Sequence, residues 1–483
     1  MRFPLFLALA SALPVAVFAA CSSTSSKTAP TGDGGSADSY DPVVTERDGS
    51  FSGPFCELPG SVVYGNDTIT VVEGGRAAPD LSWLHLPAGF CAHYFAHVGA
   101  ARQIRFAPGG ELFVASPTTP TAGGSPYGIG GIAVLADDDF DGYADGDVLP
   151  HTDNTPQALS LFVSDLPSAE GMLFAPGWFY YQNDTKIMQQ PYKTGDRAPE
   201  GPANQVANVD IYTSPLHWPK TMGLADDGTI YVGNGGDQGE ACDSTVFPRP
   251  FHGGVLKIDG TPGGTPVAQG FRNPIAVRCQ KGHNKCYAVE LALDGSGSSG
   301  GREKLVPIRQ GDDWGYPCCA TTNVPYIFVS GTPNCAKVAS ETVSFVVGHT
   351  PFGFDFEPGL WPAPYTNSIL LSLHGDVGSW TGARLVAIPT GPDGSPITTS
   401  ELSGDGTPPL EFAQGWDDGL RDHGHPDDVA FARDGRAFIA NDVTGDVFWI
   451  APVTLNQARD GGAEADVGTR DAAKDAQDGG AGD

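Results

Sequence analysis

The chain has 483 residues and a formal net charge of −30 at pH 7, and most of the acidic excess lies between residues 51 and 454. Binding to nucleic acids needs a basic surface that neutralises phosphates, so this charge argues against a nucleic-acid partner. The 65 glycines and 41 prolines predict many turns and few helices.

Residues 1–20 have the features of an export signal. Arg2 supplies a positive start, residues 3–18 are mostly apolar, and two small residues precede Cys21. A cysteine at such a cleavage site is typical of a bacterial lipobox, in which the thiol is acylated. We therefore expect a lipoprotein anchored in the cell envelope through Cys21, with Ser22 favouring the outer membrane. An ordinary signal peptide is the alternative.

Residues 21–50 and 455–483 are rich in small and polar side chains and contain few apolar ones. Such segments cannot bury enough apolar surface to offset the entropy of ordering. We expect a flexible tether before the folded body and a disordered acidic tail after it. The body should then span residues 51–454 as one domain, because no similar linker interrupts it.

The body carries an internal repeat, in which an apolar run, a turn and a second apolar run follow one another. Three clear and three weaker copies lie at residues 104–115, 222–233, 429–440, 172–181, 275–289 and 352–373. Glycine-bearing turns join the paired runs of the clear copies, as in β-hairpins. Further strand candidates lie between the copies, at residues 131–136, 254–258, 384–388 and 447–450. This content predicts an all-β, six-bladed β-propeller, with a β-sandwich or two separate β domains as alternatives.

The cysteine count favours disulfides. Nine cysteines are present, and lipidation of Cys21 would leave an even number in an oxidising compartment. Cys279 and Cys286 flank a hairpin turn, so we pair them. Cys56 and Cys91 are expected to staple the N-terminal arm to the first blade. The pairing stays open for Cys242, Cys318, Cys319 and Cys335. A zinc site is less favoured because the chain has no Cys-x-x-Cys pair.

Four aspartates alternate in a pattern typical of the start of a calcium loop: Asp137, Asp139, Asp141 and Asp145. Val148 stands where such a loop usually carries a bidentate glutamate, so Asp147 would have to substitute. The segment is therefore either a structural calcium site or an acidic hairpin tip.

Two motifs resemble a known family. The first opens the third repeat with His217-Trp-Pro-Lys-Thr-Met-Gly and ends with Gly236-Asp237-Gln238-Gly239, and the second reads Gly270-Phe-Arg272-Asn273-Pro. They resemble the soluble quinoprotein glucose/sorbosone dehydrogenases. Those enzymes are six-bladed propellers that bind pyrroloquinoline quinone (PQQ) at the axial mouth, with calcium beneath it. The resemblance runs from residue 84 to residue 452.

The resemblance implies roles for these residues. His217 would be the general base that takes a hydroxyl proton while hydride leaves the carbon. Gln238, Arg272 and Asn273 would contact PQQ, since a planar donor fork suits a carboxylated quinone. The implied activity is an extracytoplasmic oxidation of a CH–OH group in a sugar, a sugar aldehyde or a polyol. The electron acceptor is not identified by the sequence.

Two further stretches depart from the family pattern. Glu290 is followed by Leu-Ala-Leu, where the family has the Gln-Gly-Pro turn whose backbone binds calcium. The last repeat has His425 and Asp427, where glucose-oxidising members place two arginines. Arg384 is our candidate for the missing cation at the cofactor.

These departures keep two alternatives open. In the first, the propeller has lost its redox site and serves as a surface binding module. In the second, it is a calcium-dependent lactonase whose metal would be held by Glu290, Asn273 and Asp428.

Overall fold

The computed structural model describes residues 54–118, 128–146, 160–209, 217, 219–236, 242, 253–326, 333–376, 379–402, 404, 406–418 and 423–455. All of them belong to one compact unit, Arg47–Asp483. The predicted signal peptide, tether and acidic tail, and with them Cys21, lie outside the described residues, as does Gln238. Within the described part of the chain, no helix combines the length and the apolar character needed to cross a membrane.

Six mainly antiparallel sheets form the blades of a propeller. The first blade contains β4 (Ile104–Phe106), β5 (Leu112–Ser116), β6 (Gly131–Leu135) and β7 (Leu161–Val163). The second contains β8 (Met172–Ala175), β9 (Trp178–Asn183), β10 (Lys186–Pro191) and β11 (Asn204–Asn208). The third contains β12 (Met222–Leu224), β13 (Ile230–Asn234), β14 (Gly254–Ile258) and β15 (Thr265–Gln269).

The fourth blade contains β16 (Asn273–Gln280), β17 (Lys285–Leu291), β18 (Glu303–Pro307), β21 (Val343–Phe345) and β25 (Thr399–Ser400). The fifth contains β22 (Pro351–Phe356), β23 (Ile369–Leu373), β24 (Arg384–Ile388) and β26 (Leu410–Ala413). The sixth contains β27 (His425–Phe431), β28 (Ala437–Asp442), β29 (Asp446–Pro452), β3 (Phe90–His97), β1 (Val62–Tyr64) and β2 (Ile69–Val71).

The remaining elements are short. A separate two-stranded sheet pairs β19 (Cys319–Thr321) with β20 (Val324–Pro325). The described 3₁₀-helices are η1 (Phe55–Glu57), η4 (Ser296–Ser299), η5 (Cys335–Lys337) and η6 (Trp416–Asp418).

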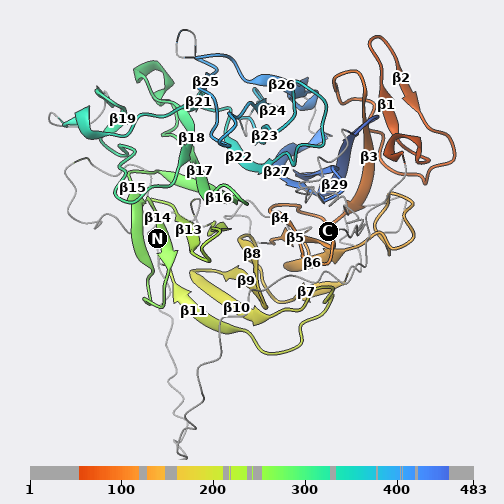
Figure 1. Cartoon of the computed structure of the whole chain (residues 1–483), viewed down its shortest axis with the longest axis horizontal. Coiled ribbons are helices and arrows are strands. Elements are labelled where there is room, and N and C mark those ends of the chain that lie inside the picture. The colour runs from red at the N-terminus through yellow and green to blue at the C-terminus, as the bar shows by residue number, and fades with distance from the viewer. Residues whose placement is uncertain are drawn as a thin grey trace, which may run out of the picture. The chain divides into compact units, whose positions relative to one another are not determined.

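The innermost strands of the six blades close into a ring. Contacts link β4, β8, β12, β16, β22 and β27 in this order, and β27 returns to β4. Each of the six predicted hairpins forms the first two strands of a blade. Figure 1 shows the blades following one another around the ring in chain order. The predicted six-bladed propeller is therefore confirmed.

The N-terminal arm corrects one expectation. Cys91 lies on β3, which pairs with β29 of the sixth blade, so the Cys56–Cys91 disulfide staples the arm to the last blade and not to the first. In Figure 1 the first strands of the chain accordingly lie beside the last ones. The physical reason is closure, because hydrogen bonds between the two ends of the folded body lock the ring.

The other disulfides are also settled. The predicted Cys279–Cys286 bridge is present, and it joins directly opposed residues of β16 and β17. The cysteines whose pairing was open form Cys242–Cys318 and Cys319–Cys335.

The hydrophobic core lies between the blades. Strands such as β5, β6 and β23 are buried at every position, because neighbouring blades cover both faces of the sheet. Phe354 and Ile369 of the fifth blade, for example, pack in one cluster with Leu305 of the fourth. This two-sided burial explains why the strands read as continuous apolar runs rather than as alternating patterns. Full burial of each such side chain contributes roughly 1.5–3 kcal/mol.

A buried ion cluster cross-links four of the innermost strands. Asp428 of β27 pairs with Arg105 of β4 at 3.1 Å and with Arg278 of β16 at 2.9 Å. Arg278 also pairs with Asp355 of β22 at 3.2 Å. Two arginines therefore balance two aspartates, as buried charges require.

Candidate functional site

The candidate site lies at one end of the innermost strands, which we call the mouth. It comprises residues at or just before the start of an innermost strand, together with residues at the end of the strand paired with it. The members discussed below are Arg102, Glu170, His217, Asn234, Arg272, Asn273, Glu290, His374, His425, Asp427 and Asp442. Except for Gln238, which is not described, the mouth contains every residue that the family resemblance assigns to catalysis or PQQ.

His217 is fixed in one tautomer. Its Nδ1 hydrogen-bonds the carbonyl oxygen of Gly236, so the proton is on Nδ1 and the lone pair is on Nε2. The side chain is 3% exposed. Gly235 makes this placement possible, since a Cβ there would lie 2.5 Å from the His217 Cβ and 3.2 Å from Asn273 Oδ1. His217 and Asn273 thus flank the same glycine.

Arg272 and Asn273 are buried at the start of the fourth blade. Asn273 Oδ1 and Arg272 Nε have no hydrogen-bond partner within the described structure. The two terminal nitrogens of Arg272 are engaged, because Nη1 donates to the carbonyl of Ala292 at 2.7 Å and Nη2 to Asp294 at 2.9 Å. The Arg272 guanidinium therefore caps the turn after Glu290, the turn at which the sequence resemblance predicts backbone ligands for calcium.

Glu290 holds the backbone of Arg272 in place through a hydrogen bond. Its Oε1 accepts the backbone N–H of Arg272 at 2.7 Å. Burial raises the pKa of Glu290 to about 7, although the Arg272 amide and Lys304 oppose the shift. Burial also lowers the pKa of Lys304, whose Nζ donates to the carbonyl of Ala320 at 2.8 Å.

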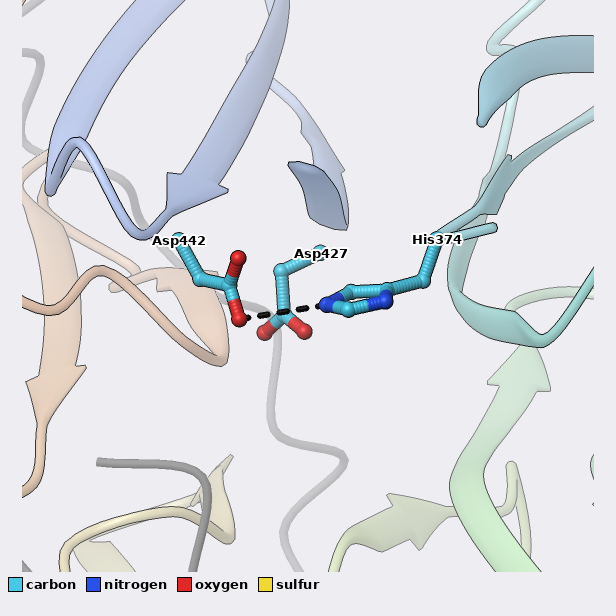
Figure 2. A group of neighbouring side chains, drawn as sticks. All are labelled: His374, Asp427 and Asp442. Carbon is cyan, nitrogen blue, oxygen red and sulfur yellow. Dashed lines mark hydrogen bonds and ion pairs between the residues drawn. The ribbon is translucent and has the colours of Figure 1, made fainter. Parts of the chain in front are cut away.

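The fifth, sixth, first and second blades bring a second set of polar side chains to the mouth. His374, Asp427 and Asp442 converge there, with the His374 and Asp442 side chains joined by a 3.1 Å contact between Nε2 and Oδ2 (Figure 2). Arg102 Nη1 lies 2.9 Å from Asp442 and 3.2 Å from Asp427, and Arg102 Nε lies 3.5 Å from Glu170. All five side chains are buried.

Burial and charge act on these carboxylates in opposite directions. Burial raises the pKa of Glu170 to about 7 and raises the pKa of Asp427 well above its ordinary value, with Arg102 opposing both shifts. Burial would also raise the pKa of Asp442, but contacts with His374 and Arg102 outweigh it and hold this pKa at about 2. Asp442 is therefore the ionised member of the set.

Aromatic rings hold His374 and His425 in place. The His374 ring stacks on Phe352 at 4.4 Å and on His425 at 4.1 Å between centroids, and His425 stacks on Trp380 at 4.3 Å. Burial, followed by the proximity of His374, lowers the pKa of His425 to about 4. His425 is thus a neutral packing residue near pH 7, not a substitute for an arginine charge.

The predicted calcium loop lies away from the mouth, after β6. Three carboxylate oxygens, one each from Asp137, Asp139 and Asp141, lie within 4.8 Å of one another. Asp145 is not part of this set, since its Oδ2 accepts the backbone N–H of Asp138 at 2.8 Å. Asp137 accepts two backbone N–H groups within the loop, and burial raises its pKa to about 6. A structural calcium ion at this loop stays a prediction.

Arg384 lies at the mouth end of the fifth blade, opposite Leu373, but one strand farther out than the mouth residues. It begins β24, the third strand of the fifth blade, and its guanidinium pairs with Glu401 and with Glu411. Its Nη1 donates to the carbonyl of Gly382 at 2.8 Å. With these donors engaged, we leave Arg384 out of the cofactor-binding set proposed below.

Sequence reasoning missed five members of the mouth: Arg102, Glu170, Asn234, His374 and Asp442. A signal was present for three of them, because Asn234, His374 and Asp442 directly follow or end the second apolar run of a repeat. Asn234 and Glu290 occupy corresponding places in the third and fourth blades. Aligning the six repeats would therefore have marked polar residues at this position as a set.

Comparisons with known proteins bear on the fold. No protein-family model and no curated protein matches the chain. A solved structure of a Trichoderma reesei carbohydrate-active enzyme of family AA12 matches with a TM-score of 0.60 at 16% identity, covering 76% of this chain and 97% of that one.

Two other solved structures give a similar picture. The holo form of the pyranose dehydrogenase PQQ domain from Coprinopsis cinerea has a TM-score of 0.60 at 14% identity, with 77% of this chain and 98% of that one covered. A putative oxidoreductase (glucose dehydrogenase) from Thermus thermophilus has a TM-score of 0.50 at 14% identity, with coverages of 75% and 100%. At such identities these likenesses establish a shared fold.

Proposed function

We propose that this chain is a PQQ-dependent oxidoreductase that converts a CH–OH group of a sugar, a sugar aldehyde or a polyol to a carbonyl. The observation that carries the proposal is His217, whose Nδ1 bond to Gly236 leaves the basic lone pair on Nε2 at the mouth of a propeller. The similarity of the fold to the Coprinopsis PQQ domain supports it.

The residues at the mouth fit PQQ. Arg272 Nε is a buried donor without a partner and suits an oxygen of a carboxylated quinone. Asn273 offers a side-chain amide beside the same glycine that His217 contacts. A buried polar atom without a hydrogen bond is costly, so a ligand that satisfies these atoms would be favoured. Arg272, Asn273 and the undescribed Gln238 are therefore the proposed cofactor contacts.

The protein's own part in the reaction is positioning and proton transfer. When bound, PQQ supplies a two-electron acceptor for the hydride that leaves the substrate carbon. His217 Nε2 takes the hydroxyl proton, and the Gly236 carbonyl stabilises the resulting imidazolium through Nδ1–H. The buried position of His217 keeps bulk water from competing for that proton.

We do not assign calcium to the cofactor site. The Ala292 carbonyl, which would face the ion in the family, accepts a hydrogen bond from the Arg272 guanidinium. With this carbonyl engaged, the Arg272 guanidinium occupies the position beside Ala292 that the ion would need. The fixed charge of Arg272 is our proposed substitute.

We also propose that the protein acts outside the cytoplasm, attached to the envelope through lipid on Cys21. Four disulfides in the described residues support an oxidising compartment. Small sugars and polyols would be the partners, and we propose no contact with nucleic acid.

A decayed binding module is the second candidate function. It is favoured by the engagement of both terminal nitrogens of Arg272 and by the lack of an arginine charge at His425. The lactonase alternative is weaker, because Asp428 is tied to Arg105 and Arg278 and cannot serve as a metal ligand.

Dye-linked turnover separates the two candidates. The full chain, incubated with PQQ, should reduce an artificial dye with at least one member of a panel of aldoses, sugar aldehydes and polyols. His217→Ala should lower turnover by about 10²–10⁴-fold, the usual contribution of a general base, while PQQ affinity stays unchanged. The matched control is His283→Ala, an exposed histidine in the turn between β16 and β17, at the opposite end of these strands.

Two results would count against this proposal, the first against the role of His217 and the second against enzymatic activity. One is turnover that survives in His217→Ala, which would remove the histidine from the chemistry. The other is tight PQQ or sugar binding without any turnover across the panel, which would identify a binding module.

A further inference from the structure

We propose that His374, Asp427 and Asp442 form a mononuclear site for a divalent first-row transition metal such as Zn²⁺ or Mn²⁺. The site shares the mouth with the proposed PQQ contacts but uses none of the same residues, and it differs from the acidic loop after β6. It is built by the fifth and sixth blades, with His374 directly after β23, Asp427 in β27 and Asp442 at the end of β28.

The donor atoms are placed as a metal requires. Three possible ligand atoms lie within 4.8 Å of one another: a ring nitrogen of His374 and one carboxylate oxygen each from Asp427 and Asp442. Ligands that bind an ion at about 2.1 Å and meet at a right angle lie about 3 Å apart. The His374 Nε2 and Asp442 Oδ2 are 3.1 Å apart. Figure 2 shows the three side chains pointing toward one another from separate segments.

The His374 ring is oriented as in many metal sites. Its Nδ1 faces the carbonyl of Gly375 at 3.4 Å, and a ligating histidine usually donates its second N–H to such an oxygen. Stacking on Phe352 and His425 fixes the plane of the ring. The ring therefore needs no rearrangement to present Nε2 to an ion.

An unsatisfied oxygen points to a missing partner. Asp442 Oδ1 is buried and makes no hydrogen bond in the described structure, whereas Asp427 Oδ1 and Glu170 Oε2 lie 3.2 Å and 3.5 Å from Arg102 without forming a hydrogen bond. Asp427 is 2% exposed and Asp442 is 7% exposed. Buried carboxylate oxygens are normally satisfied by donors or by a metal.

The charge balance is compatible with a dication. Three carboxyl groups, from Glu170, Asp427 and Asp442, surround one guanidinium, that of Arg102. A divalent ion would displace the protons that burial favours on Glu170 and Asp427. The set would then be neutral, as the Arg105–Asp428–Arg278–Asp355 cluster already is. Arg102 then remains as the hydrogen-bonding neighbour of the ligating carboxylates.

The donor types narrow the class of ion. An imidazole with two carboxylates suits Zn²⁺, Mn²⁺ or Fe²⁺ better than Ca²⁺ or Mg²⁺, which prefer oxygen alone. Three protein ligands leave coordination positions for water or for a small oxygen-donor ligand at the mouth.

Metal titration of the full chain tests this proposal. After chelation and buffer exchange, calorimetry with Zn²⁺ and separately with Mn²⁺ should give one site per chain, with Ca²⁺ and Mg²⁺ binding at least tenfold more weakly there. His374→Ala and Asp442→Asn should each weaken that site at least tenfold. Asp139→Asn, which alters the acidic loop, and His283→Ala, which removes an exposed histidine, should leave it unchanged.

Spectroscopy on the unmutated chain tests the same proposal without any variant, so its result does not depend on whether the variants fold. X-ray absorption of the Zn²⁺-loaded protein should show one imidazole among oxygen ligands, and Co²⁺ should give a visible spectrum of mixed nitrogen and oxygen coordination. The proposal is overturned if no stoichiometric transition metal binds, if the bound metal has only oxygen ligands, or if His374→Ala binds it as well as the unmutated chain.

Discussion

Glu303 illustrates how single buried residues set the pH response of this protein. It begins β18, is 3% exposed, and its Oε2 accepts the backbone N–H of Thr350 at 2.5 Å, which links the fourth and fifth blades. Burial raises its pKa from 4.5 to about 8, while the amides of Thr350 and Gly348 oppose the shift. The folded protein therefore holds a proton on Glu303 that the unfolded chain releases.

The sign of the effect follows from this difference. Between pH 4.5 and about 8 the folded state binds more protons at Glu303 than the unfolded state, so its contribution to stability falls as pH rises. Glu303→Gln removes this titration and keeps an acceptor for Thr350. As the pH rises from 5 to 8, the free energy of unfolding of the variant should therefore increase relative to that of the unmutated chain. The relative increase should be on the order of 2–4 kcal/mol.

Denaturant unfolding at the two pH values measures this gain. The exposed carboxylate of Glu73 provides the control, and Glu73→Gln should follow the unmutated chain at both values. Parallel stability curves for Glu303→Gln and the unmutated chain would show that Glu303 does not titrate in this window.

At the same scale, the sequence predicted some site residues and missed others for a clear reason. His217 and Asn273 stand in contiguous motifs, so a local pattern was enough to place them at the mouth. Arg102 and Asp442 meet across 340 residues of chain, and no local pattern reports such a contact. The direction of the Arg272 guanidinium also depends on a remote turn, at Ala292 and Asp294.

Among the structural elements, the closing sheet and the fourth-blade hairpin are each held by one disulfide. Cys56–Cys91 closes a segment with a sequence separation of 35, whereas Cys279–Cys286 closes one of 7. In the chain-entropy model a longer closed loop restricts the unfolded chain more. Loss of the first bridge should then cost about 4 kcal/mol and loss of the second about 2.5 kcal/mol.

The double variants C56A/C91A and C279A/C286A allow a direct comparison by denaturant unfolding. We expect the first pair to lose more stability than the second by about 1 kcal/mol or more, since it also frees the arm that carries η1. An equal loss in the two pairs would indicate that β1, β2 and η1 stay docked on the sixth blade without the bridge.

The hairpins themselves were predictable because their signal is local. Two apolar runs around a turn, repeated six times, specify the inner two strands of each blade, and all six were found. The pairing of β3 with β29 was not predicted. Because of this pairing, Cys91 belongs to the last blade and not to the first, which was the blade predicted from the sequence. Pairing between the ends of the body leaves no trace in either strand alone.

For the molecule as a whole, the ring brings residues from all six blades to one mouth. A fold of this kind is compatible with many functions, so function must be argued from the side chains at the mouth. There, His217 presents a basic nitrogen, and Asn273 and Arg272 offer unsatisfied polar atoms. The second and sixth blades add a buried cluster of acids around Arg102. The first group supports redox catalysis with PQQ, and the second supports a separate metal.

Equilibrium titration of the full chain with PQQ, followed by the absorbance of the quinone, tests the central claim most directly. We predict saturation at one PQQ per chain with micromolar or tighter affinity, with the same affinity in calcium and in chelator, because Arg272 replaces the ion. Asn273→Ala should weaken this binding, while His283→Ala should not. Absence of saturable binding at micromolar PQQ in both buffers would contradict the account.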